Sequence, residues 1–132
     1  MPYFSKISKA RLATCHPDLQ RLFTEVIKEY DCAILCGYRT EKDQEEAFLN
    51  GSSNAHWPDS PHNKKPSIAV DARPCPLDWG NIDAFLALRN LCELTARNLG
   101  ISLKPILRFK NVKGQTIVDY PHFEIDCWKD ET

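Results

Sequence analysis

Two histidines of this chain stand near carboxylates that could share a metal ion with them. His62 precedes Asp71 by nine residues, and His122 follows Asp119 by three. Two imidazoles and one carboxylate make a typical catalytic zinc set, because three protein ligands leave a fourth position for water. A further carboxylate must then take a proton and pass it to a leaving amine, and Asp119 is the candidate for that base.

Spacing alone leaves simpler interpretations open. Four histidines and 18 acidic residues offer many such trios, and each histidine could have a surface or core-packing role. His56 could replace one of the ligands, although no matching motif surrounds it. Glu124 lies two residues after His122, so on a strand it shares that face and could orient the ligand from outside.

Three segments resemble motifs of one enzyme family. Ser60–His62, followed by Ser67–Asp71, resembles the Ser-x-His…Ala-x-Asp motif of the D-alanyl-D-alanine carboxypeptidase family of zinc peptidases. Asp119–Glu124 is similar to the second motif of that family. Gly37–Thr40, with Gln44, is similar to its Gly-Tyr-Arg segment. The motifs occur in the family's order, and the match is best to the phage endolysin branch, which cleaves the L-alanyl–D-glutamate bond of peptidoglycan.

The resemblance implies roles for individual residues. The zinc ligands would be His62, Asp71 and His122, and Asp119 would be the catalytic base. Two departures from the widespread pattern stand out. The first histidine and the aspartate are usually seven residues apart rather than nine, and the base is often a glutamate. Both departures are found in the endolysin variant, and the longer spacing is interpreted as a loop insertion.

Arg39 and Ser60 are the expected substrate-binding residues. The planar, permanently charged guanidinium of Arg39 suits a substrate carboxylate or a developing oxyanion. The alternative is a surface arginine paired with an acid. Ser60 would hydrogen-bond the substrate, although a capping or turn role is an equal alternative. Trp57 and Trp79 flank the metal segment, where they would either line a groove for glycan or peptide or pack at its rim.

The predicted function is zinc-dependent hydrolysis of peptidoglycan stem peptides by an endolysin-type lysis enzyme. Removal of a terminal D-alanine by a carboxypeptidase is the alternative reaction. A non-catalytic wall-binding or structural-zinc module is the alternative of another class, since one fold can host many functions. The presence of Asp119 argues against that module, because a structural site needs no base.

Composition restricts the partners and the compartment. A net charge of −1 gives no electrostatic footprint for nucleic acid. The apolar runs are too short for membrane insertion, and the first residues lack the apolar region of a secretory signal. We therefore expect synthesis in the cytoplasm, six reduced cysteines, and a pore-forming lysis partner that gives access to the wall. Cys32 and Cys36 are four residues apart, which is not the Cys-x-x-Cys spacing of zinc and redox motifs.

The apolar patterns predict a single α+β domain over residues 1–132, with about three helices and a small, mainly antiparallel sheet. Helices are expected over 19–30, 41–49 and 81–98, the last of them apolar around much of its circumference and deep in the domain. Strands are expected over 32–36, 67–71, 102–109 and 122–126. The polar segment 52–66 is expected to be a long functional loop.

Overall fold

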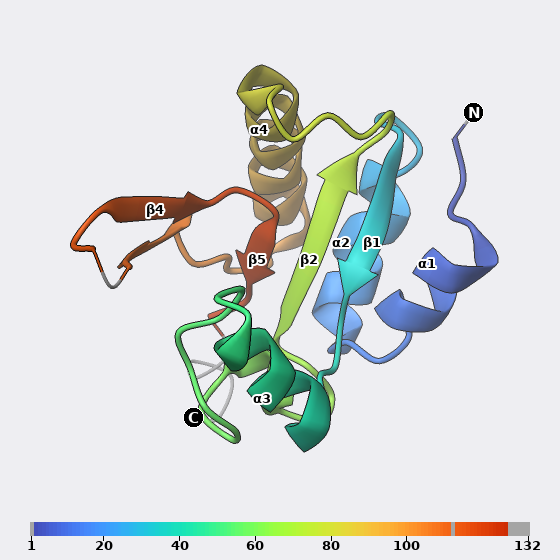
Figure 1. Cartoon of the computed structure of the whole chain (residues 1–132). Helices are drawn as coiled ribbons and strands as arrows, with labels where there is room; N and C mark the ends of the chain where they lie inside the picture. The colour runs from blue at the N-terminus through green and yellow to red at the C-terminus, as the bar shows by residue number, and fades with distance from the viewer. Residues whose placement is uncertain (1, 112, 127–132) are drawn as a thin grey trace.

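The computed structural model describes residues 2–111 and 113–126, which form a mixed α+β fold. The elements, in chain order, are α1 (Lys6–Leu12), α2 (Pro17–Val26), β1 (Cys32–Cys36), α3 (Glu41–Leu49), the 3₁₀ turn η1 (Pro61–Asn63), β2 (Ala69–Pro74), α4 (Ile82–Leu99), β3 (Leu107–Lys110), β4 (Thr116–Asp119) and β5 (His122–Glu124). Figure 1 shows their arrangement. The α+β prediction with antiparallel strands is confirmed.

A three-stranded antiparallel sheet with the order β1-β2-β5 forms the centre of the molecule. β2 is the middle strand, and its Asp71 pairs with His122 on β5 and with Cys36 on β1. The pairing of β1 with β2 is irregular between Ile34 and Cys36. Three residues with potential ligand atoms therefore stand side by side across the sheet. β3 and β4 form a separate two-stranded hairpin.

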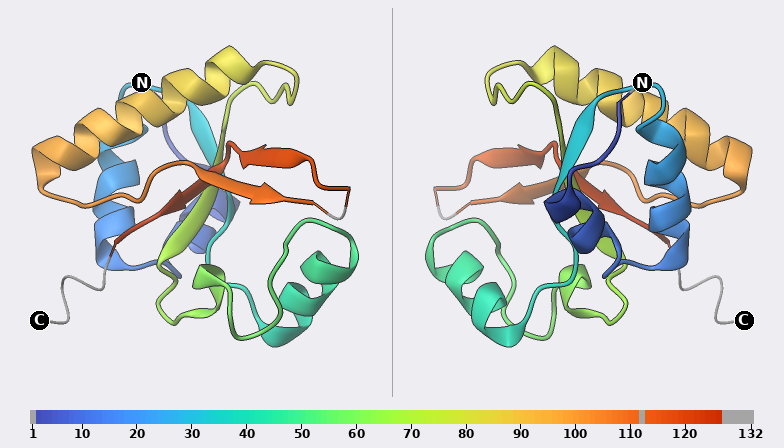
Figure 2. Two further views of the ribbon diagram at one scale, coloured as in Figure 1. Left: turned by 90° about the vertical axis from the view of Figure 1, so that its left-hand side faces the viewer. Right: turned by 90° about the vertical axis from the view of Figure 1, so that its right-hand side faces the viewer.

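Helices α2 and α4 cover one side of the central sheet, whereas α3 and the β3–β4 hairpin extend on the other (Figure 2). The core between the sheet and these two helices contains fully buried apolar side chains, among them Leu22, Phe23, Val70, Cys92 and Phe123. Burial of such side chains contributes roughly 1.5–3 kcal/mol each. The helices α2 and α4 therefore pack against the sheet and support it. The other side of the sheet faces α3, the hairpin and their connecting loops.

Capping residues set the helix ends close to the predicted positions. The side chain of Asn81 accepts a hydrogen bond from the amide of Ala84 at the start of α4, and Gly100 ends that helix with a φ of 74°. Helix α3 has the predicted bounds, with Thr40 as its N-cap. Helix α2 ends at Val26, four residues before the predicted end, although the backbone continues in turns to Tyr30.

Several predicted elements were wrong in extent or were missed. The predicted strand 102–109 is reduced to β3, because Pro105 has no N–H to donate to a ladder. Helix α1 and strand β4 had not been predicted. The strand predicted over 67–71 runs instead from 69 to 74. Helix α4 buries one face only, since Leu86 and Leu94 are 38% and 49% exposed.

No helix in the described ranges is both long and apolar enough to cross a membrane. Five cysteines have free thiols, namely Cys15, Cys32, Cys36, Cys75 and Cys92. The sixth, Cys127, lies outside the described residues.

Replacement of Gly37 by alanine should destabilise the fold. A Cβ atom there would lie 2.5 Å from the backbone oxygen of Arg11, 2.9 Å from Cys15 Sγ, and closer still to Thr14 Oγ1. We expect Gly37→Ala to lower the free energy of unfolding by about 1–3 kcal/mol in urea denaturation. Gly80→Ala is the control, because its Cβ would meet only one side-chain atom, at 3.3 Å. Equal stability of the two variants would contradict the close packing at Gly37.

Candidate active site

The three predicted metal ligands converge on one carboxylate oxygen. Nε2 of His62 lies 3.3 Å from Oδ1 of Asp71, and Nδ1 of His122 lies 3.4 Å from the same oxygen. The two imidazole rings are nearly perpendicular, with centroids 5.4 Å apart. Asp71 Oδ1 is buried and has no hydrogen-bond partner in the described structure. A buried carboxylate oxygen needs a partner, and here it lies between two ring nitrogens. These three atoms together form a set of ligands that a divalent metal ion could bind.

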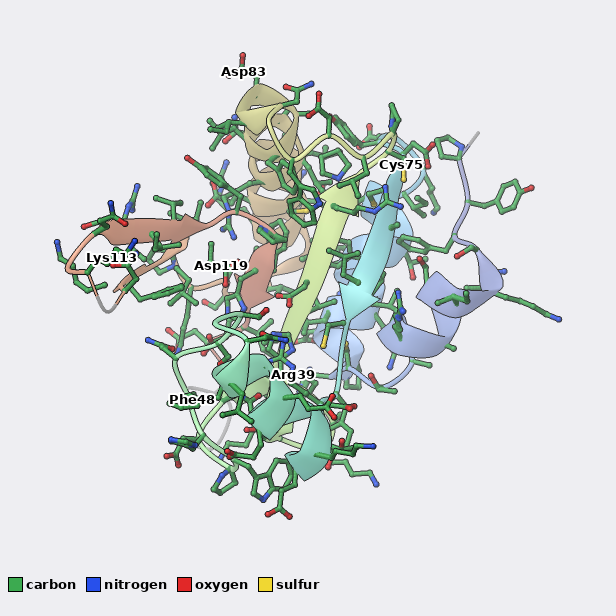
Figure 3. The ribbon with its side chains drawn as sticks, in the orientation of Figure 1. Arg39, Phe48, Cys75, Asp83, Lys113 and Asp119 are labelled. Carbon is green, nitrogen blue, oxygen red and sulfur yellow. The ribbon has the colours of Figure 1, made fainter. Side chains whose placement is uncertain are left out.

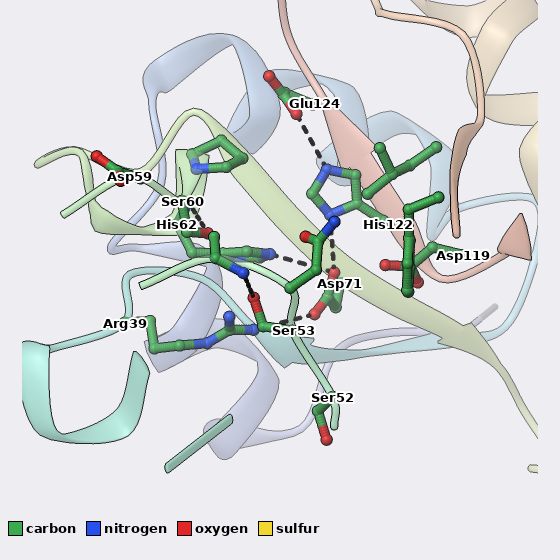
Figure 4. A pocket seen from close by; sticks show the side chains of 15 residues that line it. Arg39, Ser52, Ser53, Asp59, Ser60, His62, Asp71, Asp119, His122 and Glu124 are labelled. Carbon is green, nitrogen blue, oxygen red and sulfur yellow. Dashed lines mark hydrogen bonds and ion pairs between the residues drawn. The ribbon is translucent and has the colours of Figure 1, made fainter. Parts of the chain in front are cut away.

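Each imidazole is held by its other nitrogen. Nδ1 of His62 donates to the backbone oxygen of Gly37 at 2.8 Å, because a carbonyl can only accept. Nε2 of His122 lies 3.1 Å from Oε1 of Glu124, whose other oxygen pairs with Lys104 at 2.8 Å. The remaining nitrogen of each ring faces Asp71 (Figure 4). Glu124 therefore lies where the sequence analysis expected it, beside His122 and able to orient that ring from outside the ligand set.

The charges of the site stabilise one another against burial. Burial raises the pKa of the Asp71 carboxyl, but His122 and His62 hold that pKa well below its ordinary value. Burial lowers the pKa of His62, but the nearby Asp71 carboxylate and Cys36 thiol raise it to about 10. An imidazole binds a metal ion only through an unprotonated nitrogen, so metal and protons compete for this site.

The structure adds Cys36, which the sequence did not indicate. Cys36, His62 and Asp71 each offer a ligand atom within 4.8 Å of the others, and such a group could hold a metal ion. The Cys36 thiol lies 3.9 Å from Nδ1 of His62, on the side of the ring that faces Gly37. Its position follows from strand register, because Cys36 pairs with Asp71 across the sheet.

A cleft of about 200 Å³ opens at these residues and contains all the other predicted site residues. Asp119, at the end of β4, and Arg39, just after β1, lie on opposite sides of Asp71 (Figure 4). Figure 3 shows the same two side chains at the base of the hairpin and near α3. Burial raises the pKa of Asp119, and the Asp71 carboxylate raises it further, against the lowering effect of His122.

A buried glutamine orients Arg39. Oε1 of Gln44 accepts hydrogen bonds from Nη1 of Arg39 at 2.9 Å and from the side-chain amide (Nδ2) of Asn63 at 3.2 Å. Its Nε2 donates to Ser53 Oγ and to the backbone oxygen of Ala55. Gln44 is fully buried, with every hydrogen-bonding position satisfied. It connects Arg39, η1 and the loop that forms one wall of the cleft.

A buried arginine supports the ligand strand from the packed side. Arg89 of α4 donates from Nη2 to the backbone oxygen of His122, and its guanidinium lies 4.3 Å from the ring centroid of Phe123. Nη1 of Arg89 pairs with Glu93 at 3.7 Å. No short-range sequence signal indicates this contact, because the two residues are 33 positions apart.

The other sequence candidates have different surroundings. Ser60 is buried, and its Oγ accepts a hydrogen bond from the His62 amide, which is a capping contact at η1. His56 is exposed and pairs with Glu45 at 2.9 Å. Among the described residues that line the cleft, neither Trp57 nor Trp79 occurs. Trp79 instead stacks on Phe85 and is 58% exposed.

The model of the phage L-alanyl-D-glutamate peptidase family matches residues 1–125. The chain belongs to this family. It is 31% identical over 106 residues to the L-alanyl-D-glutamate peptidase of Escherichia phage T5, covering 76% of this chain and 77% of that protein. The resemblance found in the motifs is thereby confirmed, and the chain is a peptidase.

The fold also matches a solved structure, the Serratia marcescens L-Ala D-Glu endopeptidase ChiX. The TM-score is 0.76, and the alignment covers 99% of this chain and 96% of that one. At 23% sequence identity, this likeness shows a shared fold.

The arrangement around Gln44 can be tested in the peptidase. Gln44→Glu keeps the acceptor for Arg39 but places a second acceptor against the backbone oxygen of Ala55. We expect a loss of about 1–3 kcal/mol in the free energy of unfolding. We also expect faster proteolysis of the loop at residues 52–56. The control is Gln115→Glu, an exposed glutamine that keeps its acceptor role toward Asn111. Wild-type stability and protease resistance of Gln44→Glu would show that this glutamine does not hold the loop.

Proposed function

We propose that this chain is a zinc-dependent endopeptidase that hydrolyses the L-alanyl–D-glutamate bond of peptidoglycan stem peptides. The observation that carries the proposal is the orphaned Oδ1 of Asp71 between Nε2 of His62 and Nδ1 of His122. The family of the chain supports the substrate. The proposal takes residues 1–132 as one peptidase domain.

We assign the metal to His62, Asp71 and His122. Two imidazole nitrogens and a carboxylate oxygen are ligands that zinc commonly takes, and three protein ligands leave a coordination position open for catalysis. When bound there, zinc would polarise the scissile carbonyl and make water reactive near neutral pH. His62 and His122 each direct a ring nitrogen to the same oxygen, which favours this set.

The group of Cys36, His62 and Asp71 is the competing set. The Cys36 thiol faces the nitrogen of His62 that already donates to the Gly37 carbonyl. A metal ion bound at that nitrogen would have to break this hydrogen bond. Cys36 is therefore proposed to support His62 rather than to bind zinc.

Asp119 is the proposed general base. Its carboxylate lines the same cleft as Asp71 and His122. Its raised pKa makes it a stronger proton acceptor than an ordinary aspartate. Asp119 would accept a proton from the attacking water and deliver it to the amine of the departing D-glutamate.

Arg39 is the proposed substrate-binding cation. Its Nη1 is fixed by Gln44, and its Nη2 lies 3.7 Å from Oδ2 of Asp71. From this position it would pair with a substrate carboxylate or a developing oxyanion. The Ser60 hydroxyl accepts a hydrogen bond from the backbone amide of His62 and so positions this ligand. We propose that Ser60 also hydrogen-bonds the substrate.

The proposal includes a pore-forming lysis partner, because peptidoglycan lies outside the cytoplasmic membrane. The carboxypeptidase alternative has less support than the endopeptidase, since the family is one of L-alanyl-D-glutamate peptidases. A non-catalytic module has less support for the same reason.

The roles of base and ligand can be separated by two amide substitutions. Asp119→Asn should keep the metal and the fold but lower the rate about 10²- to 10⁴-fold, because an amide cannot accept the proton. Asp71→Asn should lose zinc as well as rate, because it weakens a ligand. His62→Ala and His122→Ala should also lose zinc. The measurements are zinc content by mass spectrometry and the rate of release of peptide from purified cell wall.

Asp59→Asn is the matched control for charge, since Asp59 lines the cleft but has no assigned role. It should keep both zinc and most of the rate. Near wild-type hydrolysis by Asp119→Asn would remove Asp119 as the base and make Glu124 the next candidate. Full zinc occupancy in both histidine variants would overturn the metal assignment.

A further inference from the structure

The β3–β4 hairpin has one apolar face that turns toward the active-site cleft. Cross-strand partners in an antiparallel pair lie on the same face. Leu107 pairs with Asp119, and Phe109 pairs with Ile117, so these four side chains share one face. Leu107, Phe109 and Asp119 line the cleft. The face is therefore continuous with the proposed base.

The opposite face of the hairpin contains two basic side chains and only one apolar one, Val118. It presents Arg108 and Lys110, whose partners are Val118 and Thr116. None of these four side chains is among the described residues that line the cleft. The alternation thus places the two basic side chains away from the cleft, and Leu107, Phe109 and Ile117 on the face that also has Asp119.

The apolar face is not explained by core packing. Leu107 and Ile117 are 37% and 36% exposed, and neither belongs to the hydrophobic core cluster of the described residues. Figures 1 and 2 show the hairpin projecting from the central sheet on the side of α3. An exposed apolar strip that continues an active site indicates a binding surface.

The other side of the cleft has a different character. Arg39 is the one permanent cation among the described residues that line the cleft; Ser52, Ser53 and Ser60 also line it, and Gln44 connects Ser53 to Arg39. Asp71 lies between Arg39 and Asp119 (Figure 4). The cleft therefore runs from a cationic, hydroxyl-lined side to an apolar side.

The two halves of the proposed substrate differ in the same way. On one side of the scissile bond, L-alanine is acylated by the lactyl group of an uncharged muramoyl sugar. On the other side, D-glutamate has a carboxylate next to the bond. We propose that the hairpin face of Leu107, Phe109 and Ile117 binds the muramoyl–lactyl end of the stem, while the carboxylate of D-glutamate lies toward Arg39. This proposal rests on the function proposed above.

The register separates two positions along the face. Leu107 is opposite Asp119, whereas the pair of Phe109 and Ile117 lies two residues farther along the hairpin, roughly 7 Å away. Leu107 would contact the alanyl and lactyl methyl groups, close to the bond. Phe109 and Ile117 would contact the sugar. The second pair should therefore distinguish a substrate that has the sugar from one that lacks it.

The test compares two synthetic substrates, N-acetylmuramoyl-L-alanyl-D-glutamyl-lysine and N-acetyl-L-alanyl-D-glutamyl-lysine. Both have an acylated, uncharged alanine, and only the first has the sugar. Ile117→Ala and Phe109→Ala should lower kcat/KM about tenfold for the muramoyl substrate, mainly through KM, and change it less than about twofold for the acetyl substrate. Arg108→Ala, on the opposite face, should leave the ratio between the two substrates at its wild-type value.

The outcomes separate the two proposals. If the wild-type protein hydrolyses both substrates and the two variants lose equally on both or on neither, the hairpin subsite is wrong and the proposed function stands. If the wild-type protein hydrolyses neither substrate with zinc bound, the proposed function fails and the subsite fails with it. A change in the ratio caused by Arg108→Ala alone would place the sugar on the other face and overturn the subsite.

Discussion

A buried carboxylate between two imidazoles is the constraint on which the rest of the structure depends. Asp71 lies on the middle strand of a three-stranded sheet, where burial alone opposes its charge. The nearby nitrogens of His62 and His122, at 3.3 and 3.4 Å, offset that cost, together with Nη2 of Arg39 at 3.7 Å. Strand β5 and the turn η1 must therefore be held in register with β2, although the ligands come from positions up to 60 residues apart in sequence.

The structure meets this requirement with supports on three sides. The backbone oxygen of Gly37 and the carboxylate of Glu124 each fix the outer nitrogen of one imidazole. Arg89 holds the backbone of β5 from the packed side, and Gln44 holds Arg39 on the open side. Such outer contacts set the orientation and the tautomer of metal-binding histidines. The site is thus organised by the fold before any substrate arrives.

The sequence predicted the parts of the structure that depend on local signals. Caps and turn residues set the ends of α3 and α4, and the motif residues His62, Asp71 and His122 come together as the resemblance implied. What depends on register could not be predicted. Cys36 reaches the site through its pairing with Asp71, in a region where the pairing of β1 and β2 is irregular. The apolar face of the hairpin depends on β4, a four-residue strand with no local signal strong enough to indicate it.

X-ray absorption spectroscopy at the zinc edge of the purified protein tests the central claim most directly. The ligand set of His62, Asp71 and His122 predicts a first shell of nitrogen and oxygen only, at about 2.0–2.2 Å, with the outer-shell scattering of two imidazoles. The same spectrum should be obtained for Cys36→Ser. A sulfur atom at about 2.3 Å in the wild-type protein that disappears in Cys36→Ser would contradict the account, because it would place the metal on Cys36, His62 and Asp71 instead.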